Sequence, residues 1–248
     1  MDDVELFALG RMTNSSDAMF ARRRRILDET RAMLVRDGLE GFNVRELCRR
    51  ADVGSRTFYN AFTSKENVIA LAIKGYFDAF QSRAEQGLDL STFEGSLTHQ
   101  ATVILRNQQL PSYLQAVAAI YFSMTADQAI RRVLTTIGEQ SWLRWLRAMQ
   151  IRRQLERGVD IDGLALDLSD LQFAKVHEWG VGSLSDEAYF DRSIAGVLTM
   201  LSGATRGEAR ADVREAVLDF HDKGPLRARI VSEAQTRIAL MQADEGKT

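Results

Sequence analysis

A run of hydrogen-bonding side chains lies between residues 55 and 60. It holds hydroxyl, guanidinium, phenol and amide groups, contributed by Ser55, Arg56, Thr57, Tyr59 and Asn60. Such groups hydrogen-bond to phosphate oxygens and base edges of duplex DNA. In a helical segment, Phe58 and Phe62 share the opposite face, because they are four residues apart. The pattern predicts a short helix that buries its phenylalanines and presents a polar ridge, residues 55–60, to DNA.

A second short helix is expected immediately before this ridge. Asn43 is a favoured N-cap residue, and Glu46 three residues later completes the pattern of a capping box. Leu47 and Ala51 are four residues apart and form one apolar face. The next helix begins near Gly54, after a tight turn. Two short helices joined in this way predict a helix-turn-helix.

Longer helices are expected on both sides of this motif. The apolar pattern of residues 26–36 predicts a helix that ends at Gly38. Thr63 and Glu66 form a second capping-box pattern, and the helix that they begin runs to about Arg83. Together these helices predict a three-helix head followed by a connecting helix.

Positive charge is concentrated on this head. Residues 20–65 contain eleven Lys and Arg against six Asp and Glu, a balance of +5, whereas the whole chain carries −2. Four arginines, Arg22–Arg25, oppose the helix dipole if a helix begins there. We interpret Arg22 and Arg23 as an arm or first turn that contacts DNA, the alternative being a solvated surface run. Arg45 and Lys65 complete the predicted set of DNA-contacting cations.

The motifs of the head occur at fixed spacing. They are Asp37-Gly38, Phe42-Asn43-Val44-Arg45-Glu46-Leu47, Ala51-Asp52-Val53-Gly54, Thr57-Phe58-Tyr59-Asn60-Ala61-Phe62 and Ser64-Lys65-Glu66. Over residues 24–72 this pattern resembles the TetR (tetracycline-repressor-like) family of transcriptional regulators. One departure is Gly54, where the family usually carries Ser. The resemblance implies a homodimer that binds double-stranded DNA and a helical body that binds a small effector.

The remainder of the chain reads as helical, so the fold class is all-α. The expected domains are a flexible leader (1–19), a helix-turn-helix DNA-binding domain (20–66) and a larger helical regulatory and dimerisation domain (67–248). Body helices are expected near residues 93–107, 112–124, 127–157, 164–181, 185–202, 207–221 and 226–243. The pattern of 127–157 is long enough to break near Gly138.

Aromatic residues on the body helices form the candidate effector site. The predicted ligand-binding residues are Phe122, Trp142, Trp145, Met149, Phe173, His177 and Trp179, with His99 and Gln140 as further polar groups. An apolar cavity with a few polar groups is typical of small-molecule sites. The alternative is a plain hydrophobic core.

The apolar face of residues 185–202 is the candidate dimer seam. It contains Tyr189, Ile194, Val197, Leu198 and Leu201, and Ala195, Gly196 and Gly203 permit close approach. The resemblance implies that such helices pair with their twins in a four-helix bundle. The alternative is burial against the helices after residue 207.

Catalytic patterns are absent from the sequence. His99, His177 and His221 lack metal-ligand spacing, and Asp160–Gly163 lacks the further carboxylates of a calcium loop. The single cysteine, Cys48, fits a buried residue in a reducing compartment. No apolar run approaches a membrane span. We expect no enzyme, metal, cofactor or membrane contact, and a cytoplasmic, nucleoid-associated location.

The sequence therefore predicts a DNA-binding transcriptional regulator. In the favoured form it is a repressor released from a near-palindromic operator by a small, mainly apolar effector. The alternative is a constitutive dimeric DNA-binding regulator without a small-molecule ligand.

Overall fold

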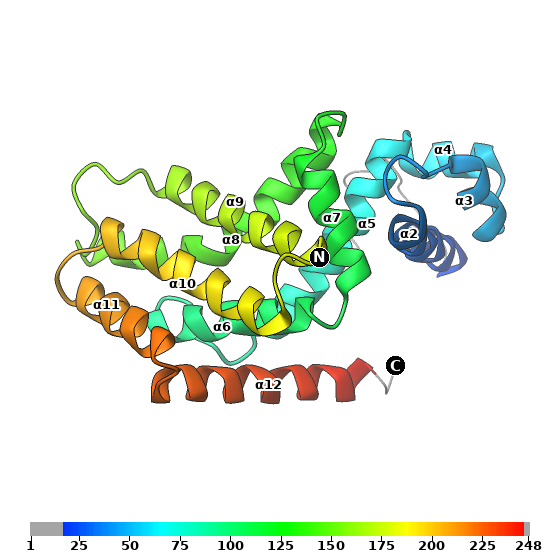
Figure 1. Cartoon of the computed structure of the whole chain (residues 1–248). Helices are drawn as coiled ribbons and strands as arrows, with labels where there is room; N and C mark the ends of the chain where they lie inside the picture. Colours follow the sequence, from blue (N-terminus) through cyan, green and yellow to red (C-terminus); the bar gives the residue numbers. More distant parts are fainter. Residues whose placement is uncertain (1–16, 246–248) are drawn as a thin grey trace. The chain divides into compact units, whose positions relative to one another are not determined.

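The computed structural model describes residues 17–245. The predicted leader falls outside this range except for residues 17–19, which begin a helix. Eleven α-helices, α2 to α12, make up the regular structure of the described residues, and an isolated bridge between Leu155 and Thr205 is the one extended pairing there. The all-α prediction is confirmed (Figure 1).

The helices divide between two compact units. The first comprises the described residues up to Phe80 together with Ala116–Leu134, and the second comprises Gln81–Gln115 and Thr135 onward. The first unit therefore extends beyond the predicted boundary at residue 66. It contains α2 (Asp17–Asp37), α3 (Val44–Arg50), α4 (Ser55–Phe62) and most of α5 (Lys65–Ala84).

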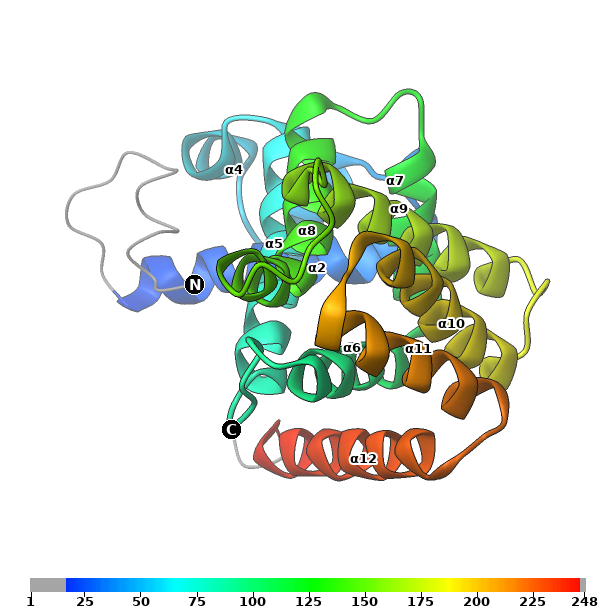
Figure 2. The ribbon, with the colours of Figure 1, turned by 90° about the vertical axis from the view of Figure 1, so that its left-hand side faces the viewer.

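The second unit is built from the later helices. α7 (Pro111–Phe122) and α8 (Gln128–Ile151) contribute to both units. The others lie wholly in the second unit: α6 (Phe93–Asn107), α9 (Ile161–Gly180), α10 (Asp186–Ala204), α11 (Gly207–His221) and α12 (Pro225–Glu245). α12 packs along α6, and α10 packs against both α9 and α11 (Figures 1 and 2).

α8 departs from the sequence prediction at two places. It ends at Ile151 instead of near residue 157, because Arg153 adopts a left-handed backbone conformation (φ 57°) and the amide of Gln154 donates to the Met149 carbonyl at 2.8 Å. The helix continues through Gly138 without a break. A Cβ atom at Gly138 would lie 1.7 Å from the Ser169 hydroxyl oxygen. Glycine at this position therefore allows α8 and α9 to approach closely.

The apolar face of α10 is buried within the subunit. The five residues assigned to the dimer seam are each at most 2% exposed: Tyr189, Ile194, Val197, Leu198 and Leu201. The helices that pack against α10 are α9, α11 and α6. Side chains already covered by their own chain leave no area for a second chain. This placement corrects the assignment of these five residues to the dimer interface.

Candidate nucleic-acid interface

The N-terminus of α3 is capped as the sequence predicts, but only in part. The Asn43 side-chain oxygen accepts hydrogen bonds from the backbone amides of Arg45 (2.8 Å) and Glu46 (3.3 Å). The Glu46 carboxylate does not complete a capping box, because it pairs with the Arg49 guanidinium at 2.6 Å. This pairing lowers the pKa of Glu46, mainly through the hydrogen bond from Arg49. One half of the predicted capping box is therefore replaced by an ion pair along α3.

α4 presents the predicted polar ridge. Gly54 is its N-cap, and Phe58 and Phe62 are fully buried (0% exposed) with ring centres 5.8 Å apart. On the other side, Tyr59 is 52% exposed. Ser55, Arg56 and Asn60 are also exposed, and Thr57 is half-buried. The buried phenylalanines fix which face of α4 points outward, so the donors of the ridge remain available to a ligand.

The corner between α4 and α5 differs from the predicted capping box. Thr63 has a left-handed backbone (φ 61°) and ends α4, while the Ser64 hydroxyl accepts from the Asn67 amide at 3.0 Å. The Asn67 side chain also donates to the Phe62 carbonyl at 2.9 Å. Ser64 and Asn67 therefore perform the capping that the sequence assigned to Thr63 and Glu66. They fix α4 against the start of α5.

The arginine run of residues 22–25 lies inside α2, not at a helix start, because α2 begins at Asp17. Arg22 is exposed, and the Arg25 guanidinium donates to the Ala51 carbonyl at 2.8 Å. Arg23 points inward: its guanidinium carbon lies 4.8 Å from the centre of the Phe62 ring, and its Nε and Nη2 atoms are buried. Burial lowers the pKa of Arg23. Two of its three guanidinium nitrogens are therefore turned away from phosphates, which argues against the predicted DNA contact of Arg23.

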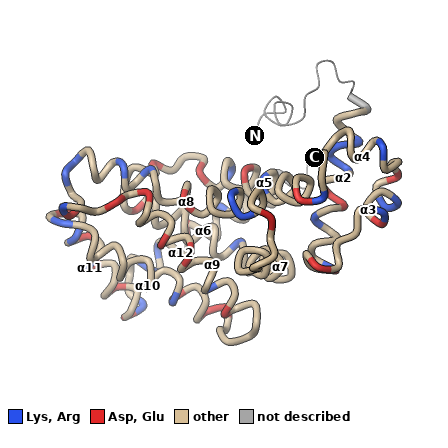
Figure 3. Tube along the Cα trace, turned by 90° about the horizontal axis from the view of Figure 1, so that it is seen from above, with Lys and Arg blue, Asp and Glu red and all other residues tan. Residues whose placement is uncertain are grey.

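Arg45 and Lys65, the other cations discussed as DNA contacts, are at least partly exposed. Arg45 is exposed in the first turn of α3. Lys65 opens α5, is half-buried, and places its ammonium 5.7 Å from the centre of the Phe42 ring. Figure 3 shows Lys and Arg along α2, α3 and α4, interspersed with acidic residues. The first unit therefore offers positive groups on α3 and α5, the helices that precede and follow the ridge in the chain.

Cys48 is buried between the helices of the motif. Burial raises the pKa of its thiol, and a hydrogen bond with Ser55 opposes that rise. A buried thiol with a raised pKa carries little thiolate, the reactive form. Cys48 is therefore a packing residue of α3, as the sequence predicts.

Only some of the predicted effector-binding residues are buried. Trp142, Trp145, Met149, Phe173 and Trp179 are buried, whereas Phe122 is 47% exposed and His177 and Gln140 are exposed. Trp179 stacks on Tyr189 with ring centres 4.9 Å apart and donates to the Asp186 carboxylate at 2.8 Å. Exposed side chains cannot line an interior cavity, so Phe122, His177 and Gln140 are removed from the candidate lining. Trp142 and Phe173 remain its best members.

Sequence reasoning missed the environment of His99. The imidazole is fully buried in α6, and neither nitrogen has a hydrogen-bond partner among the described residues. Burial is the main cause that lowers its pKa to about 4, with smaller contributions from Arg144 and Arg237. His99 is therefore neutral at pH 7. The mostly polar run of residues 98–100 was a signal that this part of α6 faces more than an apolar core.

The described residues contain neither a candidate metal cluster nor a candidate membrane-spanning helix. No group of three or more His, Cys, Asp and Glu residues is placed to hold a metal ion there. No helix in the same range is long and apolar enough to cross a membrane.

Comparisons with known proteins agree with this geometry. Residues 26–72 match the family model of "Bacterial regulatory proteins, tetR family". The HTH-type transcriptional repressor KstR of Rhodococcus jostii is 27% identical over 176 residues, which cover 71% of this chain and 81% of KstR. The matched residues include all of α3 and α4 and the adjoining parts of α2 and α5.

Solved structures share the fold. A TetR-family regulator from Rhodococcus sp. has a TM-score of 0.56 at 16% identity and covers 73% of this chain and 98% of its own. FadR of Thermus thermophilus, a TetR-family repressor solved with lauroyl-CoA, has a TM-score of 0.59 at 14% identity, with 75% and 96% covered. The similarity to these structures extends well beyond the helix-turn-helix. Residues 26–72 therefore carry the helix-turn-helix of the TetR family of transcriptional regulators, and the chain as a whole shares the fold of solved members of that family.

Proposed function

We propose that the protein is a repressor that binds a near-palindromic operator as a homodimer and is released by a small, mainly apolar effector. The observation that carries the DNA-binding part is the outward ridge of α4, held by the buried Phe58 and Phe62. A recognition helix of this kind places its exposed donors against base edges in the major groove. The similarity to KstR, a repressor, supports repression over activation. As a regulator bound to chromosomal DNA, the protein acts in the cytoplasm at the nucleoid.

Selection of bound duplexes from a random pool tests the operator. A two-fold dimer places two recognition helices about 34–36 Å apart or a little more, so the enriched sequences are expected to be inverted repeats. Enrichment of a single half-site, or of no sequence above the starting pool, contradicts the proposal. Sedimentation of the protein with the selected duplex then gives the number of subunits bound.

The dimer interface is proposed to lie on the outward faces of α9 and α10. On α10 this face carries the exposed Ala195, Thr199 and Gly203, with Gly196 partly exposed. Small side chains permit two helices to approach closely, as pairing in a four-helix bundle requires. Thr199→Arg places a long charged side chain on this face and is expected to yield monomers by sedimentation. An unchanged dimer would exclude this face.

The interior of the second unit supports an effector site. Four groups there are buried without a hydrogen-bond partner among the described residues: the His99 imidazole, the Gln100 Nε2, the Trp142 Nε1 and the Ser169 hydroxyl. Gln172 of α9 donates to the Gln100 side-chain oxygen of α6 at 2.5 Å, and Gly138 of α8 lies against Ser169 of α9. These contacts join the three helices that carry the four groups.

Unpaired buried groups favour a ligand with complementary atoms. Each costs about 1–3 kcal/mol when left unsatisfied, so a bound hydrogen-bonding atom recovers part of that energy. Trp142 and Phe173 supply apolar surface beside them. The expected effector is therefore mainly apolar and carries at least one carbonyl or hydroxyl group. Since His99 is neutral at pH 7, it supplies one donor and one acceptor.

Release of the selected duplex tests the effector, with lauroyl-CoA and a set of apolar ketones and alcohols as probes. Trp142→Phe removes the indole donor and keeps an aromatic ring, so it is expected to weaken release about tenfold with DNA affinity unchanged in the absence of the probe. Trp179→Phe is the matched control, because that indole already donates to Asp186. Equal responses of both variants contradict the proposed lining.

The alternative, a constitutive regulator, is also favoured by one observation. Ordered water satisfies buried polar groups in many proteins, and four groups within one helical unit can hold such water without any ligand. In that case no probe changes DNA affinity, and a high-resolution crystal structure shows water at Trp142 Nε1. The release experiment therefore distinguishes the two functions.

A further inference from the structure

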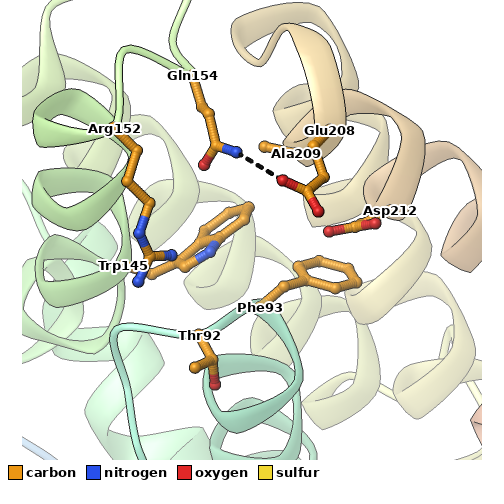
Figure 4. A pocket seen from close by; sticks show the side chains of 8 residues that line it. All are labelled: Thr92, Phe93, Trp145, Arg152, Gln154, Glu208, Ala209 and Asp212. Atoms are coloured by element: carbon orange, nitrogen blue, oxygen red, sulfur yellow. Dashed lines mark hydrogen bonds between the residues drawn. The ribbon is translucent and has the colours of Figure 1, made fainter.

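A pocket of about 300 Å³ opens between α6, α8 and α11 in the second unit (Figure 4). Its lining comes from the start of α6, the end of α8, the loop after it, and the first turns of α11: Thr92, Phe93, Trp145, Arg152, Gln154, Glu208, Ala209 and Asp212. The volume is at the lower end of the range for small-molecule sites. The pocket borders the interior site proposed for the effector, because Trp145 of its lining has its ring centre 6.2 Å from that of Trp142.

Aromatic rings form one part of the pocket wall. The rings of Phe93 and Trp145 lie 5.4 Å apart, centre to centre, at an angle of 43°. Trp145 is almost fully buried, so its indole is held in place by the core, and Phe93 is half-buried. Faces of aromatic rings attract organic cations through the ring quadrupole. This pair of rings borders the pocket. It is therefore suited to contact both the apolar body and the charged end of an amine.

Two carboxylates face the same space from α11. Glu208 and Asp212 are four residues apart on one helical face, and neither forms an ion pair among the described residues. The pKa of Asp212 is raised, first by burial and then by the negative charges of Glu208 and Glu215. The one hydrogen bond to Glu208 comes from Gln154 at a long 3.5 Å. Both carboxylates are exposed, so they are available to a cationic ligand that enters the pocket.

Arg152 is the positively charged residue of the pocket lining, and it lies away from the two carboxylates. Arg152 donates to the Ser91 carbonyl at 3.3 Å. Figure 4 shows its side chain beside Trp145, on the opposite side of the pocket from Glu208 and Asp212. The positive and negative walls thus lie on opposite sides of the pocket, with the half-buried Phe93 and the buried Trp145 between them.

We propose that this pocket binds a small organic ammonium ion. The amine lies between Glu208 and Asp212, and the apolar body rests on Phe93 and Trp145. Each carboxylate accepts a charge-assisted hydrogen bond from the ammonium group, the stronger kind of hydrogen bond. The site adds a second ligand class to the regulator, chemically distinct from the effector of the interior site.

Three probes that share a phenyl ring and differ in charge test the site: phenethylamine, 3-phenylpropan-1-ol and 3-phenylpropionate. Titration calorimetry on the full chain is expected to show binding of phenethylamine, at least tenfold weaker binding of the alcohol, and no binding of the carboxylate. Tighter binding of 3-phenylpropionate would assign the pocket to anions through Arg152 and overturn the proposal. Competition by millimolar Mg²⁺ or Ca²⁺ as effective as the amine would overturn it as well.

Conservative variants locate the amine. Glu208→Gln and Asp212→Asn keep the shape of the wall and remove one charge each, so each is expected to weaken phenethylamine binding about tenfold. Asp222→Asn removes a charge at the end of the same helix, away from the pocket, and is expected to leave binding unchanged. Equal affinity in all three variants would overturn the proposal. Circular dichroism verifies that each variant is folded.

The aromatic contribution has its own test. Phe93→Leu retains an apolar side chain and loses the ring, so phenethylamine is expected to bind at least threefold more weakly. The apolar alcohol should lose much less affinity, since it carries no charge to interact with the ring. A parallel loss for both probes would contradict a cation held by the rings. None of these measurements uses DNA, so the pocket and the proposed repressor function are tested independently.

Discussion

The guanidinium carbon of Arg23 lies 4.8 Å from the centre of the Phe62 ring, so an arginine of α2 packs on a buried residue of α4. Its Nε and Nη2 atoms lack partners among the described residues, and burial lowers its pKa. Arg22, the neighbouring residue, is exposed. Adjacent arginines therefore have different environments, and experiments can test whether their roles differ too.

Substitution of Arg23 by methionine separates packing from DNA contact. Methionine preserves apolar contact with Phe62, and replacing a poorly paired buried charge by an apolar side chain is often close to neutral. Arg23→Met should therefore retain DNA affinity and stability, while Arg23→Ala should lower the unfolding free energy by about 1–2 kcal/mol. Thermal denaturation and DNA titration measure the two effects. A loss of DNA affinity in a stable Arg23→Met protein would restore Arg23 to the interface.

Arg56 is expected to read a base. Arg56→Ala should weaken binding to the selected operator by about 1–3 kcal/mol and relax the sequence preference at one position. Arg214, an exposed arginine of α11, provides the control, because it lies in the second unit. Competition titrations with operator and random duplexes measure both quantities. Equal discrimination by the parent protein and Arg56→Ala would assign base reading to another residue of the ridge.

Lys65 is expected to contact a phosphate. Lys65→Ala should weaken binding to all duplexes alike and reduce the slope of log affinity against log salt by about one unit. The measurement is a DNA titration at several salt concentrations. Lys65→Arg retains the charge and serves as the control. An unchanged slope would mean that the ammonium stays over the Phe42 ring in the complex.

Gly138 is expected to tolerate no side chain. A Cβ atom there would lie 1.7 Å from the Ser169 hydroxyl oxygen and 3.5 Å from a ring atom of Phe173. Gly138→Ala should therefore cost about 1–3 kcal/mol of stability through overpacking. Gly75 of α5 has open space around the same position, so Gly75→Ala should stabilise its helix by about 0.5–1 kcal/mol. Urea denaturation compares the two, and a stable Gly138→Ala protein would refute the close approach of α8 and α9.

Because His99 is buried, we expect the free energy of unfolding to rise with pH between about 4 and 6.5. Burial lowers its pKa to about 4 in the folded protein, whereas the usual value is 6.5. Below pH 6.5 the unfolded chain therefore takes up a proton that the folded chain excludes, and stability falls by up to about 3 kcal/mol near pH 4. His99→Gln should flatten this part of the stability profile relative to the parent.

The control for this profile is His177→Gln, since His177 is exposed in the folded chain. Carboxylates also titrate in this range, so the comparison of slopes between variants isolates the histidine. Identical slopes for the parent and His99→Gln would mean that water reaches the imidazole. The measurement is urea denaturation at several pH values.

Much of the helix-turn-helix could be predicted because its determinants are local. The amide of Asn43, the spacing of Phe58 and Phe62, and the glycine before α4 act within one or two turns. Gly54 illustrates this: it caps α4 in extended conformation with open space around its Cβ position, so Ser would fit there too. The other body helices end within two residues of the predicted positions, whereas α8 ends at Ile151 instead of near residue 157.

The environments of Arg23, His99 and Tyr189 could not be predicted from the sequence, because contacts with residues distant in the chain determine them. Arg23 turns inward because Phe62, far along the chain, lies beneath it. The apolar face of α10 that contains Tyr189 has the pattern of a dimer seam, but α9 and α11 of the same chain cover it. Helical spacing shows that a face is apolar but does not show which segment covers it. Pairing of helices across long separations therefore required the structure.

Burial of the apolar face of α10 within the subunit affects how operator occupancy should depend on the amount of protein in the cell. Since α6, α9 and α11 already cover it, a lone subunit does not expose a core that demands an immediate twin. We therefore expect newly made chains to fold first and, if they form the proposed dimer, to assemble afterwards. If two copies are needed at the operator, occupancy at low abundance rises with the square of the number of molecules, so a twofold change in expression alters operator occupancy about fourfold.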